Sequence, residues 1–364
     1  MRLVEVKASF PYQFYVGSDL LKGTFLVELC KPLHCHLVII TDDIVRLHWG
    51  EALQQHLKAA DLTVSLLSFP AGEIHKTRET KAALEDQLFR LQCGRDTCLI
   101  ALGGGVVLDM VGFIAATYCR GVPVIYLPTT LLAMVDASLG GKTGVNTVYG
   151  KNLIGTISSP YSVVVDVNTL ATLPDTEWKN GCVEMLKHAL LNDNSQFEAL
   201  HEFKYEVSDS LCDVVFENAL IKKNIIEQDE RENGVRQLLN LGHTIGHAIE
   251  TIENYALSHG EAVAIGLLVE SYISMRLGLL KETELLEIDS LLRKLGLPLK
   301  TKAFQHIPRF MEMLILDKKS RRKTPRFVLL EGIARPYRIG QHDTHVVEEK
   351  IILDALQWAE AYFG

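Results

Sequence analysis

The stretch Cys98-Leu-Ile-Ala-Leu-Gly103-Gly-Gly105-Val-Val-Leu-Asp109 sets the pattern for the first half of the chain. A short apolar run is followed by three glycines and then by a segment with helical spacing that continues to Tyr118. Similar apolar runs recur at residues 37–40, 64–69, 124–127 and 163–167, and an amphipathic segment lies at 77–91. Strands that alternate with helices predict a mainly parallel sheet with helices on its faces.

The pattern changes beyond residue 173, where helical spacing predominates and strand signals become rare. We therefore expect two domains, an α/β Rossmann-like domain over 1–173 and an all-α domain over 174–364. One late apolar run, at 326–330, is a strand that either returns to the first domain or pairs locally. The predicted helices of the second half cover 177–191, 209–228, 242–252, 260–276 and 282–295.

Composition restricts the class of protein and its partners. The 364 residues carry a net charge of −8, which argues against general binding to nucleic acid or to a membrane surface. A small anionic substrate would need a local cationic site. The seven cysteines are odd in number and form no Cys-x-x-Cys pair, which is typical of a reduced, cytoplasmic chain. We see no signal-peptide pattern and no apolar run long enough to span a bilayer.

A cluster of histidines indicates a metal site in the second half. In Gly-His243-Thr-Ile-Gly-His247 the two histidines are four residues apart, so both lie on one face of a helix, and His259 follows at a turn or helix start. A single histidine of this kind is more often structural. The set indicates a divalent ion, because imidazole is the commonest neutral ligand and three or four groups must converge. Glu184 would complete the coordination and leave one position open for substrate.

The three glycines suggest a nucleotide site, although a plain tight turn explains them about as well. Glycines before a helix let a diphosphate approach backbone N–H groups, where the helix dipole favours negative charge. The spacing differs from Gly-x-Gly-x-x-Gly, so the ordinary dinucleotide fingerprint is absent. Polar side chains also follow other strands, where ligands of open α/β sheets collect. These are Asp42, Glu73, Lys76, Thr129 and Thr130.

Cationic side chains gather in two further parts of the sequence. Lys142, Lys151 and Asn152 lie in glycine-rich loops that suit a phosphate or a carboxylate, although a solvated basic loop is an equally good interpretation. Glu184 and Lys187 share one helical face, and Lys222, Arg236 and Asn240 precede the histidines.

Taken together, these motifs resemble those of the 3-dehydroquinate synthase family of sugar-phosphate cyclases. The resemblance runs in order from about Thr41 to Asp317-Lys318-Lys319. It is carried by Gly-Gly-Gly-Val-Val-Leu-Asp109, Arg120-Gly-Val, Asp136-Ala-Ser-Leu-Gly-Gly-Lys142-Thr, Gly-Lys151-Asn152, Glu184-x-x-Lys187, Arg236-x-x-Leu-Asn240-x-Gly-His243-Thr-Ile-Gly-His247 and His259-Gly-Glu.

The resemblance implies an NAD-dependent lyase of the shikimate pathway of aromatic amino acid biosynthesis. The substrate would be 3-deoxy-D-arabino-heptulosonate 7-phosphate, and the products 3-dehydroquinate and phosphate. The family chemistry is a transient oxidation by NAD, β-elimination, re-reduction and an intramolecular aldol closure. The second domain would carry the metal, zinc or else cobalt, and the chain would form a homodimer.

The resemblance also assigns roles to residues. The implied metal ligands are Glu184, His243 and His259, and the implied catalytic residues are Asp136, Lys187, Lys222 and His247. Substrate would be bound by Arg120 (in the neighbouring subunit's site), Lys142, Asn152, Arg236, Asn240, and Lys318 or Lys319. The implied NAD contacts are Asp42, Glu73, Lys76, Gly104, Gly105, Asp109, Thr129, Thr130, Lys142, Lys151 and Thr172.

Two other enzymatic interpretations remain. A related cyclase could act on a sugar phosphate without a carboxylate, but it would not need the guanidinium of Arg236. A polyol dehydrogenase shares the two-domain plan, but typically supplies an aspartate to the metal and lacks the lysine-rich pocket. One departure concerns the phosphate site: Ser-Arg-Arg-Lys-Thr-Pro follows Lys319 where the family often has a glycine, so the choice between Lys318 and Lys319 stays open.

Overall fold

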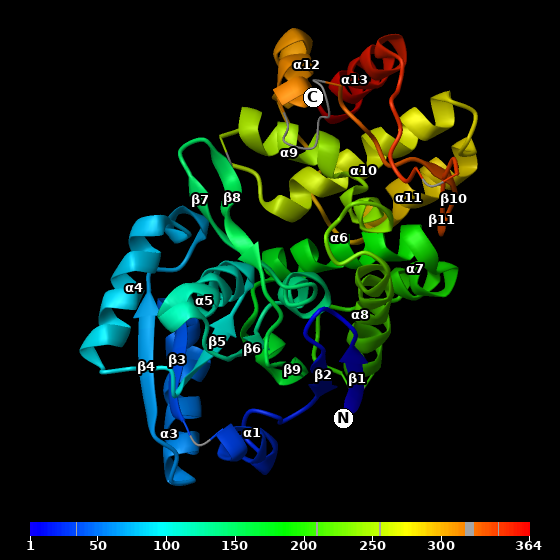
Figure 1. Cartoon of the computed structure of the whole chain (residues 1–364). Helices are drawn as coiled ribbons and strands as arrows, with labels where there is room; N and C mark the ends of the chain where they lie inside the picture. The colour runs from blue at the N-terminus through cyan, green and yellow to red at the C-terminus, as the bar shows by residue number, and fades with distance from the viewer. Residues whose placement is uncertain (34, 209, 255, 317–323, 341) are drawn as a thin grey trace. The chain divides into compact units, whose positions relative to one another are not determined.

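The computed structural model describes residues 1–33, 35–208, 210–254, 256–316, 324–340 and 342–364. The chain divides into two compact units (Figure 1). Unit 1 consists of Met1–Glu177 and Tyr205–Glu230, and unit 2 of Trp178–Lys204 and Arg231–Gly364. No helix of the described residues has the length and apolar character needed to cross a membrane.

Unit 1 is built on a seven-stranded sheet with the order β1-β2-β9-β6-β5-β3-β4. All neighbouring pairs are parallel except β1 and β2, which are antiparallel. The mainly parallel sheet was expected, but β1 and β2 were not. The strands are β1 (Arg2–Val6), β2 (Tyr12–Gly17), β3 (His36–Asp42), β4 (Val64–Phe69), β5 (Thr97–Gly103), β6 (Val124–Pro128) and β9 (Ser162–Asp166).

Helices cover both faces of this sheet. On one face, Leu37 and Ile39 of β3 belong to a core cluster with Leu26 of α1 (Thr24–Cys30) and Leu57 of α3 (Glu51–Ala59). The other face packs against α5 (Gly105–Thr117), which contacts β5, β6 and β3 and is joined by α4 (Arg78–Arg90). Burial on both faces explains why the strands are continuous apolar runs rather than alternating ones.

The sheet has a topological switch point between β3 and β5. From β3 the chain adds β4 on one side and then returns to add β5 and β6 on the other. At such a point the two connections leave in opposite directions and open a crevice outside the carboxyl ends of the strands. Asp42 ends β3, Gly104 follows β5, and Thr129 follows β6, so these predicted cofactor residues lie at the same edge of unit 1.

The glycine-rich segment around Lys142 differs from the expected loops. It forms an antiparallel hairpin of β7 (Lys142–Thr147) and β8 (Gly150–Ile157), in which Gly144 pairs with Gly155. A Cβ on Gly155 would lie 1.9 Å from the carbonyl oxygen of Thr143, so the glycine allows the two strands to approach. The hairpin packs against α5, and this contact holds it within unit 1.

Unit 2 is a helical bundle arranged around α10 (Figure 1). The predicted strand at 326–330 pairs locally, because Phe327 bridges His345 and Leu330 pairs with Pro336. The elements of unit 2 are α6 (Asp175–Asn192, whose first turn lies in unit 1), α7 (Asn194–His201), α9 (His243–Ile252), α10 (His259–Arg276), α11 (Glu282–Lys294), α12 (Ile307–Leu316), β10 (Leu330–Gly332), β11 (Arg335–Pro336) and α13 (Glu349–Phe363).

The observed division differs from a single boundary near residue 173. Helix α8 (Leu211–Gln228) follows the start of the helical half, yet it belongs to unit 1. It packs against β1 and β2, and its Lys222 contacts Asp136 of the same unit. The helical pattern of α8 is visible in the sequence, but a long-range contact of this kind is not.

Glycines allow α9 and α10 to pack unusually closely. A Cβ on Gly266 of α10 would lie 2.0 Å from the carbonyl oxygen of Gly242, and one on Gly246 would lie 3.2 Å from Val263 Cα. Gly242 itself precedes α9 with a φ of 77°, a left-handed conformation that favours glycine. The distance between the two helices is therefore set by backbone contact rather than by side-chain packing.

We predict that Gly266→Ala lowers the free energy of unfolding by about 3 kcal/mol, because the new methyl group meets backbone that cannot rotate away. Gly50→Ala is the matched control, since its Cβ would meet only ordinary contacts at 3.5 Å and its φ is −64°. Urea unfolding of both variants measures the difference. Equal stability of the two variants would contradict the close contact of α9 and α10.

Candidate metal centre and cofactor edge

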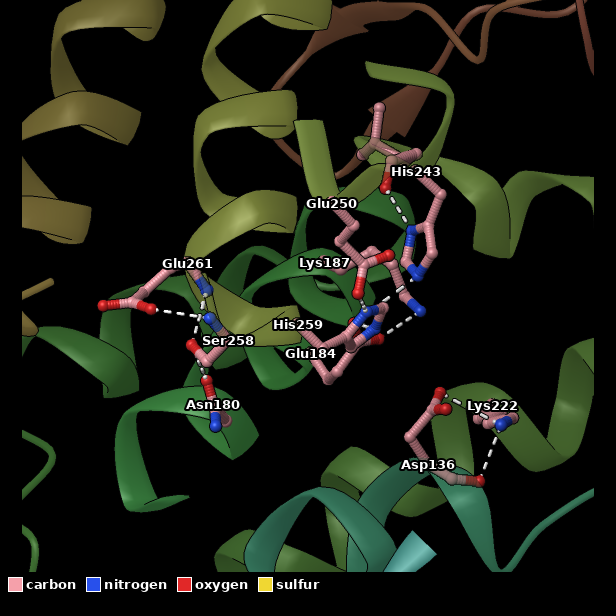
Figure 2. A network of polar contacts seen from close by, with 11 residues as sticks. Asp136, Asn180, Glu184, Lys187, Lys222, His243, Glu250, Ser258, His259 and Glu261 are labelled. Atoms are coloured by element: carbon pink, nitrogen blue, oxygen red, sulfur yellow. Dashed lines mark hydrogen bonds and ion pairs between the residues drawn. The ribbon is translucent and has the colours of Figure 1, made fainter. Parts of the chain in front are cut away.

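Three helices of unit 2 bring Glu184, His243 and His259 together (Figure 2). Glu184 lies in the middle of α6, while His243 and His259 are the first residues of α9 and α10. One ligand atom from each residue lies within 4.8 Å of the others. Glu184 is buried, with 1% of its surface exposed, although a carboxylate is costly to bury without positive charge nearby. The three residues predicted as metal ligands therefore share one site.

The distances within this group match the spacing of metal ligands better than that of hydrogen bonds. Glu184 Oε1 lies 3.6 Å from His243 Nε2 and 3.5 Å from His259 Nε2. Strong charge-assisted hydrogen bonds are about 2.7–2.9 Å long. Ligands at about 2.0–2.1 Å from a tetrahedral ion are about 3.3 Å apart. A carboxylate and two imidazoles at these separations fit a divalent ion such as zinc and leave one position open.

A backbone contact orients His243. Its Nδ1 lies 3.1 Å from the carbonyl oxygen of Leu241, so Nδ1 carries the proton and donates it there. In a neutral imidazole the other nitrogen then has a free lone pair. That nitrogen, Nε2, is the atom that faces Glu184.

His259 lies between two carboxylates. Its Nε2 faces Glu184, and its Nδ1 lies 3.5 Å from Oε1 of Glu250, a buried residue in the last turn of α9. Burial lowers the pKa of His259, but the contacts with Glu184 and Glu250 outweigh it and raise the pKa to about 9. In the absence of a cation, a proton on His259 therefore offsets part of the buried negative charge.

The backbone around His259 is fixed by a capping box. Ser258 Oγ accepts a hydrogen bond from the N–H of Glu261, and Glu261 Oε2 accepts one from the N–H of Ser258. The same Ser258 hydroxyl donates to Asn180 Oδ1 of α6 at 2.8 Å (Figure 2). A Cβ on Gly260 would lie 2.6 Å from Asn180 Cα. The start of α10 is thus held against the helix that carries Glu184.

A second buried carboxylate holds the start of α9. Glu270 of α10 accepts hydrogen bonds from the N–H groups of Gly242 at 2.8 Å and Ile245 at 3.2 Å. These N–H groups have no partner within the helix, and a negative charge at a helix N-terminus is favourable. Glu270 therefore fixes the turn from which His243 extends.

The remaining predicted residues of unit 2 lie on α6, on α9 and on the 3₁₀ helix Val235–Asn240. Lys187 forms a close ion pair with Glu184, one turn away on α6. The rings of His243 and His247 have centroids 5.4 Å apart, so both lie on one face of α9. Arg236 is buried, and Asn240 donates to Glu232 Oε1 at 2.7 Å. Lys318 and Lys319 lie outside the described residues.

In unit 1, Asp136 and Lys222 form a pair. Lys222 Nζ lies 3.0 Å from Asp136 Oδ1 and donates to the Asp136 carbonyl oxygen at 2.6 Å (Figure 2). Both residues were predicted to act on substrate. The double contact ties α8 to the segment before the β7–β8 hairpin, which holds the lysine ammonium in a defined place.

Several of the predicted cofactor residues of unit 1 are linked by hydrogen bonds and an ion pair. Lys76 Nζ donates to Asp109 Oδ2 at 2.5 Å, and burial raises the pKa of Asp109 even though Lys76 opposes that shift. Asn146 of β7 donates to Glu73 at 2.7 Å and accepts the N–H of Asn152 at 3.0 Å. This joins the 73–76 segment to the hairpin strands that carry Lys142, Lys151 and Asn152.

The first turn of α5 has no side-chain cap among the described residues, because Gly104 occupies its N-cap position. The Oγ1 of Thr129 is buried and has no hydrogen-bond partner among the described residues. Asp42 accepts the N–H groups of Ile44 and Val45, so one of its oxygens caps a helix. Three further residues were predicted to contact the cofactor. Gly105 is the first residue of α5, and Thr130 follows Thr129. Thr172 accepts a hydrogen bond from Trp49 at 2.9 Å.

Arg120 does not join any of these groups. It is exposed and adopts a left-handed φ of 68° after α5. The structure thus leaves open the prediction that it serves a neighbouring subunit.

The sequence patterns assigned no role to Glu250 or Glu270. A signal existed for Glu250, because a residue seven positions after His243 returns to the same helical face. Glu270 carries no comparable signal, since its carboxylate acts on a helix almost thirty residues away, and only the fold shows the contact.

Comparison with known proteins identifies the class first. A solved 2-epi-5-epi-valiolone synthase from Streptomyces hygroscopicus, with NAD+ and Zn2+ bound, covers 100% of both chains with 28% identity and a TM-score of 0.88. A 2-deoxy-scyllo-inosose synthase in complex with carbaglucose-6-phosphate, NAD+ and Co2+ gives 26% identity and a TM-score of 0.87, covering 98% of this chain and 100% of the other. The fold is that of the sugar-phosphate cyclases.

Family models narrow the class further. The model for the 3-dehydroquinate synthase N-terminal region matches residues 66–180, and that for the C-terminal region matches residues 181–320. A 3-dehydroquinate synthase from Acidithiobacillus ferrooxidans is 41% identical over 337 residues, which is 91% of this chain and 92% of the relative. The chain belongs to the 3-dehydroquinate synthase family.

The Lys76–Asp109 pair gives a testable prediction. Lys76→Met removes the buried cation that pairs with the partly buried Asp109 carboxylate, and should lower the free energy of unfolding by about 3 kcal/mol at pH 7. Lys294→Met is the matched control, because Lys294 and Glu202 are exposed and 3.5 Å apart, a pair worth less than about 1 kcal/mol. Urea unfolding without NAD measures both; equal losses would contradict the buried pair.

Proposed function

We propose that this protein is a 3-dehydroquinate synthase that converts 3-deoxy-D-arabino-heptulosonate 7-phosphate into 3-dehydroquinate and phosphate. The observation that carries the proposal is the Glu184–His243–His259 group, whose separations suit one divalent ion. It occurs in a chain that is 41% identical to a synthase over nine tenths of its length. In this proposal, unit 1 binds NAD and unit 2 binds the metal.

The metal is proposed to be zinc or cobalt, held by Glu184, His243 and His259. Zinc and cobalt in the two related cyclases support this choice. A bound cation would act as a Lewis acid on a hydroxyl oxygen of the substrate. The buried Glu184 supplies the negative charge of the site, and the Nδ1–H of His243 donates a hydrogen bond to the Leu241 carbonyl oxygen, which keeps its Nε2 available.

NAD is proposed to bind at the carboxyl edge of the unit 1 sheet. When bound, it accepts a hydride from the substrate and returns it later in the same turnover. The uncapped first turn of α5 suits its diphosphate, and the buried hydroxyl of Thr129, which has no partner in the described part of the chain, can bond to a ligand. The proposed contacts are Asp42, Glu73, Lys76, Gly104, Gly105, Asp109, Thr129, Thr130, Lys142, Lys151 and Thr172.

The cationic residues are proposed to bind the substrate. Lys187 and Lys222 would stabilise oxyanion character, with Asp136 orienting a hydroxyl group. The guanidinium of Arg236 suits a carboxylate through a bidentate pair, which favours a substrate with a carboxylate over a neutral sugar phosphate. His247 would act near the phosphate. The proposed phosphate contacts are Lys142, Asn152, Asn240, His247, and Lys318 or Lys319.

The proposed assembly is a homodimer in the cytoplasm. Arg120 is exposed and held in a left-handed conformation, and its guanidinium would contribute to the partner's site. This part of the proposal rests on the family resemblance.

The proposed reaction consumes no NAD overall, so the assay is decisive. The purified protein is incubated with the heptulosonate phosphate and a catalytic amount of NAD, and phosphate and NADH are measured together. We predict phosphate release over many turnovers without accumulation of NADH. Stoichiometric NADH would indicate a dehydrogenase, and turnover of a sugar phosphate without a carboxylate, but not of this one, would indicate another cyclase.

Two histidine variants separate the metal ligands from their neighbour on α9. His259→Ala should lose bound metal and essentially all turnover while its circular dichroism stays that of a folded protein. His247→Ala should keep metal but turn over more slowly. Metal content by atomic emission, measured beside activity, checks both. Full activity of a metal-free His259→Ala protein would contradict the ligand assignment.

A further inference from the structure

The position of His259 alone does not determine which of its ring nitrogens faces the metal site. It is the first residue of α10, its side chain is 35% exposed, and either ring nitrogen can carry the proton. Only Nε2 faces Glu184. Metal binding displaces the Nε2 proton, and a ring flip or a neutral tautomer with its proton on Nε2 would withdraw the Nε2 lone pair from the site.

Glu250 is placed to prevent that change. Its carboxylate is buried at the end of α9, and its Oε1 lies 3.5 Å from His259 Nδ1, on the ring edge opposite the one that faces Glu184. At 3.5 Å this contact is longer than a strong hydrogen bond, so Glu250 acts on the ring chiefly through its negative charge, which favours the proton on the nearer nitrogen, Nδ1. His243 has the same arrangement with a backbone carbonyl in place of the carboxylate. Each histidine thus has an acceptor at Nδ1 and directs Nε2 to Glu184.

Glu250 is not itself part of the group of ligand atoms. Among the described residues, the cluster with atoms within 4.8 Å of one another that contains both histidines consists of Glu184, His243 and His259. The carboxylate of Glu250 acts on the metal site through the imidazole of His259. Its negative charge also makes Nε2 a better electron donor.

We propose that Glu250 is a positioning residue that fixes the tautomer and orientation of His259 and thereby sets the affinity of the protein for its divalent metal. This inference rests on the proposed metal site. Carboxylates that accept the second N–H of a metal-bound histidine typically change metal affinity by about 10–100-fold when they are replaced.

The test measures metal affinity directly, without turnover. The full-length protein is stripped of metal, and Zn2+ affinity is measured by competition with a chromophoric chelator. Glu250→Ala should lose about 10–100-fold in affinity. Glu250→Gln keeps the shape but should also lose affinity, because an amide can donate to Nδ1 as well as accept from it and no longer fixes the tautomer.

Glu253→Gln is the matched control. Glu253 follows α9 by one residue and accepts hydrogen bonds from Thr301 and the N–H of Lys302, so this change removes a charge at the same helix end without touching the histidines. It should bind Zn2+ within twofold of the wild type. Near-ultraviolet circular dichroism of each metal-free variant verifies folding, and the isosteric glutamine keeps the test valid if Glu250→Ala does not fold.

The outcomes are distinct. Wild-type affinity in a folded Glu250→Gln protein would overturn the role of Glu250 while leaving the metal site intact. A merely structural role would lower the unfolding temperature of the metal-free protein with no change in affinity. If His259→Ala binds Zn2+ as tightly as the wild type, the metal site itself is wrong, and the role of Glu250 is overturned with it.

Discussion

The structure of unit 2 depends on the burial of one carboxylate. Glu184 lies in the middle of α6 with almost no exposed surface, and an ionised carboxylate in such a place needs compensating charge. Lys187 supplies one positive charge, and the protonated His259 supplies another. A divalent ion between Glu184 and the two imidazoles would replace that proton with two charges. The helices around Glu184 are arranged as such a site requires.

Close contact between backbones holds this arrangement. Gly266 meets the carbonyl of Gly242, Gly260 meets Asn180, and each leaves no room for a Cβ. Because well-packed backbone is rigid, the first residues of α9 and α10 are held relative to α6. Buried carboxylates then refine the positions, Glu270 at the start of α9 and Glu250 at the ring of His259. Helix packing, helix capping and ring orientation thus all help to position His243 and His259 relative to Glu184.

Much of the fold and of the metal site could be predicted from the sequence, and the predictions that were wrong or missing have physical reasons. The buried parallel strands are continuous apolar runs, and residue types with helical spacing predicted a metal site near the histidines. The choice of Glu184, His243 and His259 as the ligands, with His247 outside the set, followed from the family resemblance. The β7–β8 hairpin was interpreted as loops because its glycines, needed for cross-strand approach, resemble loop glycines. The place of α8 in unit 1 and the action of Glu270 on α9 are contacts between distant segments, and no local pattern encodes them.

Glu184, His243 and His259 are proposed to bind one divalent ion, and anomalous diffraction at the zinc edge from crystals grown with Zn2+ can locate that ion. We expect one strong peak about 2.0–2.2 Å from the Glu184 carboxylate and from Nε2 of both histidines. A peak bound through other residues, or none at a zinc concentration that saturates the protein in solution, would contradict it.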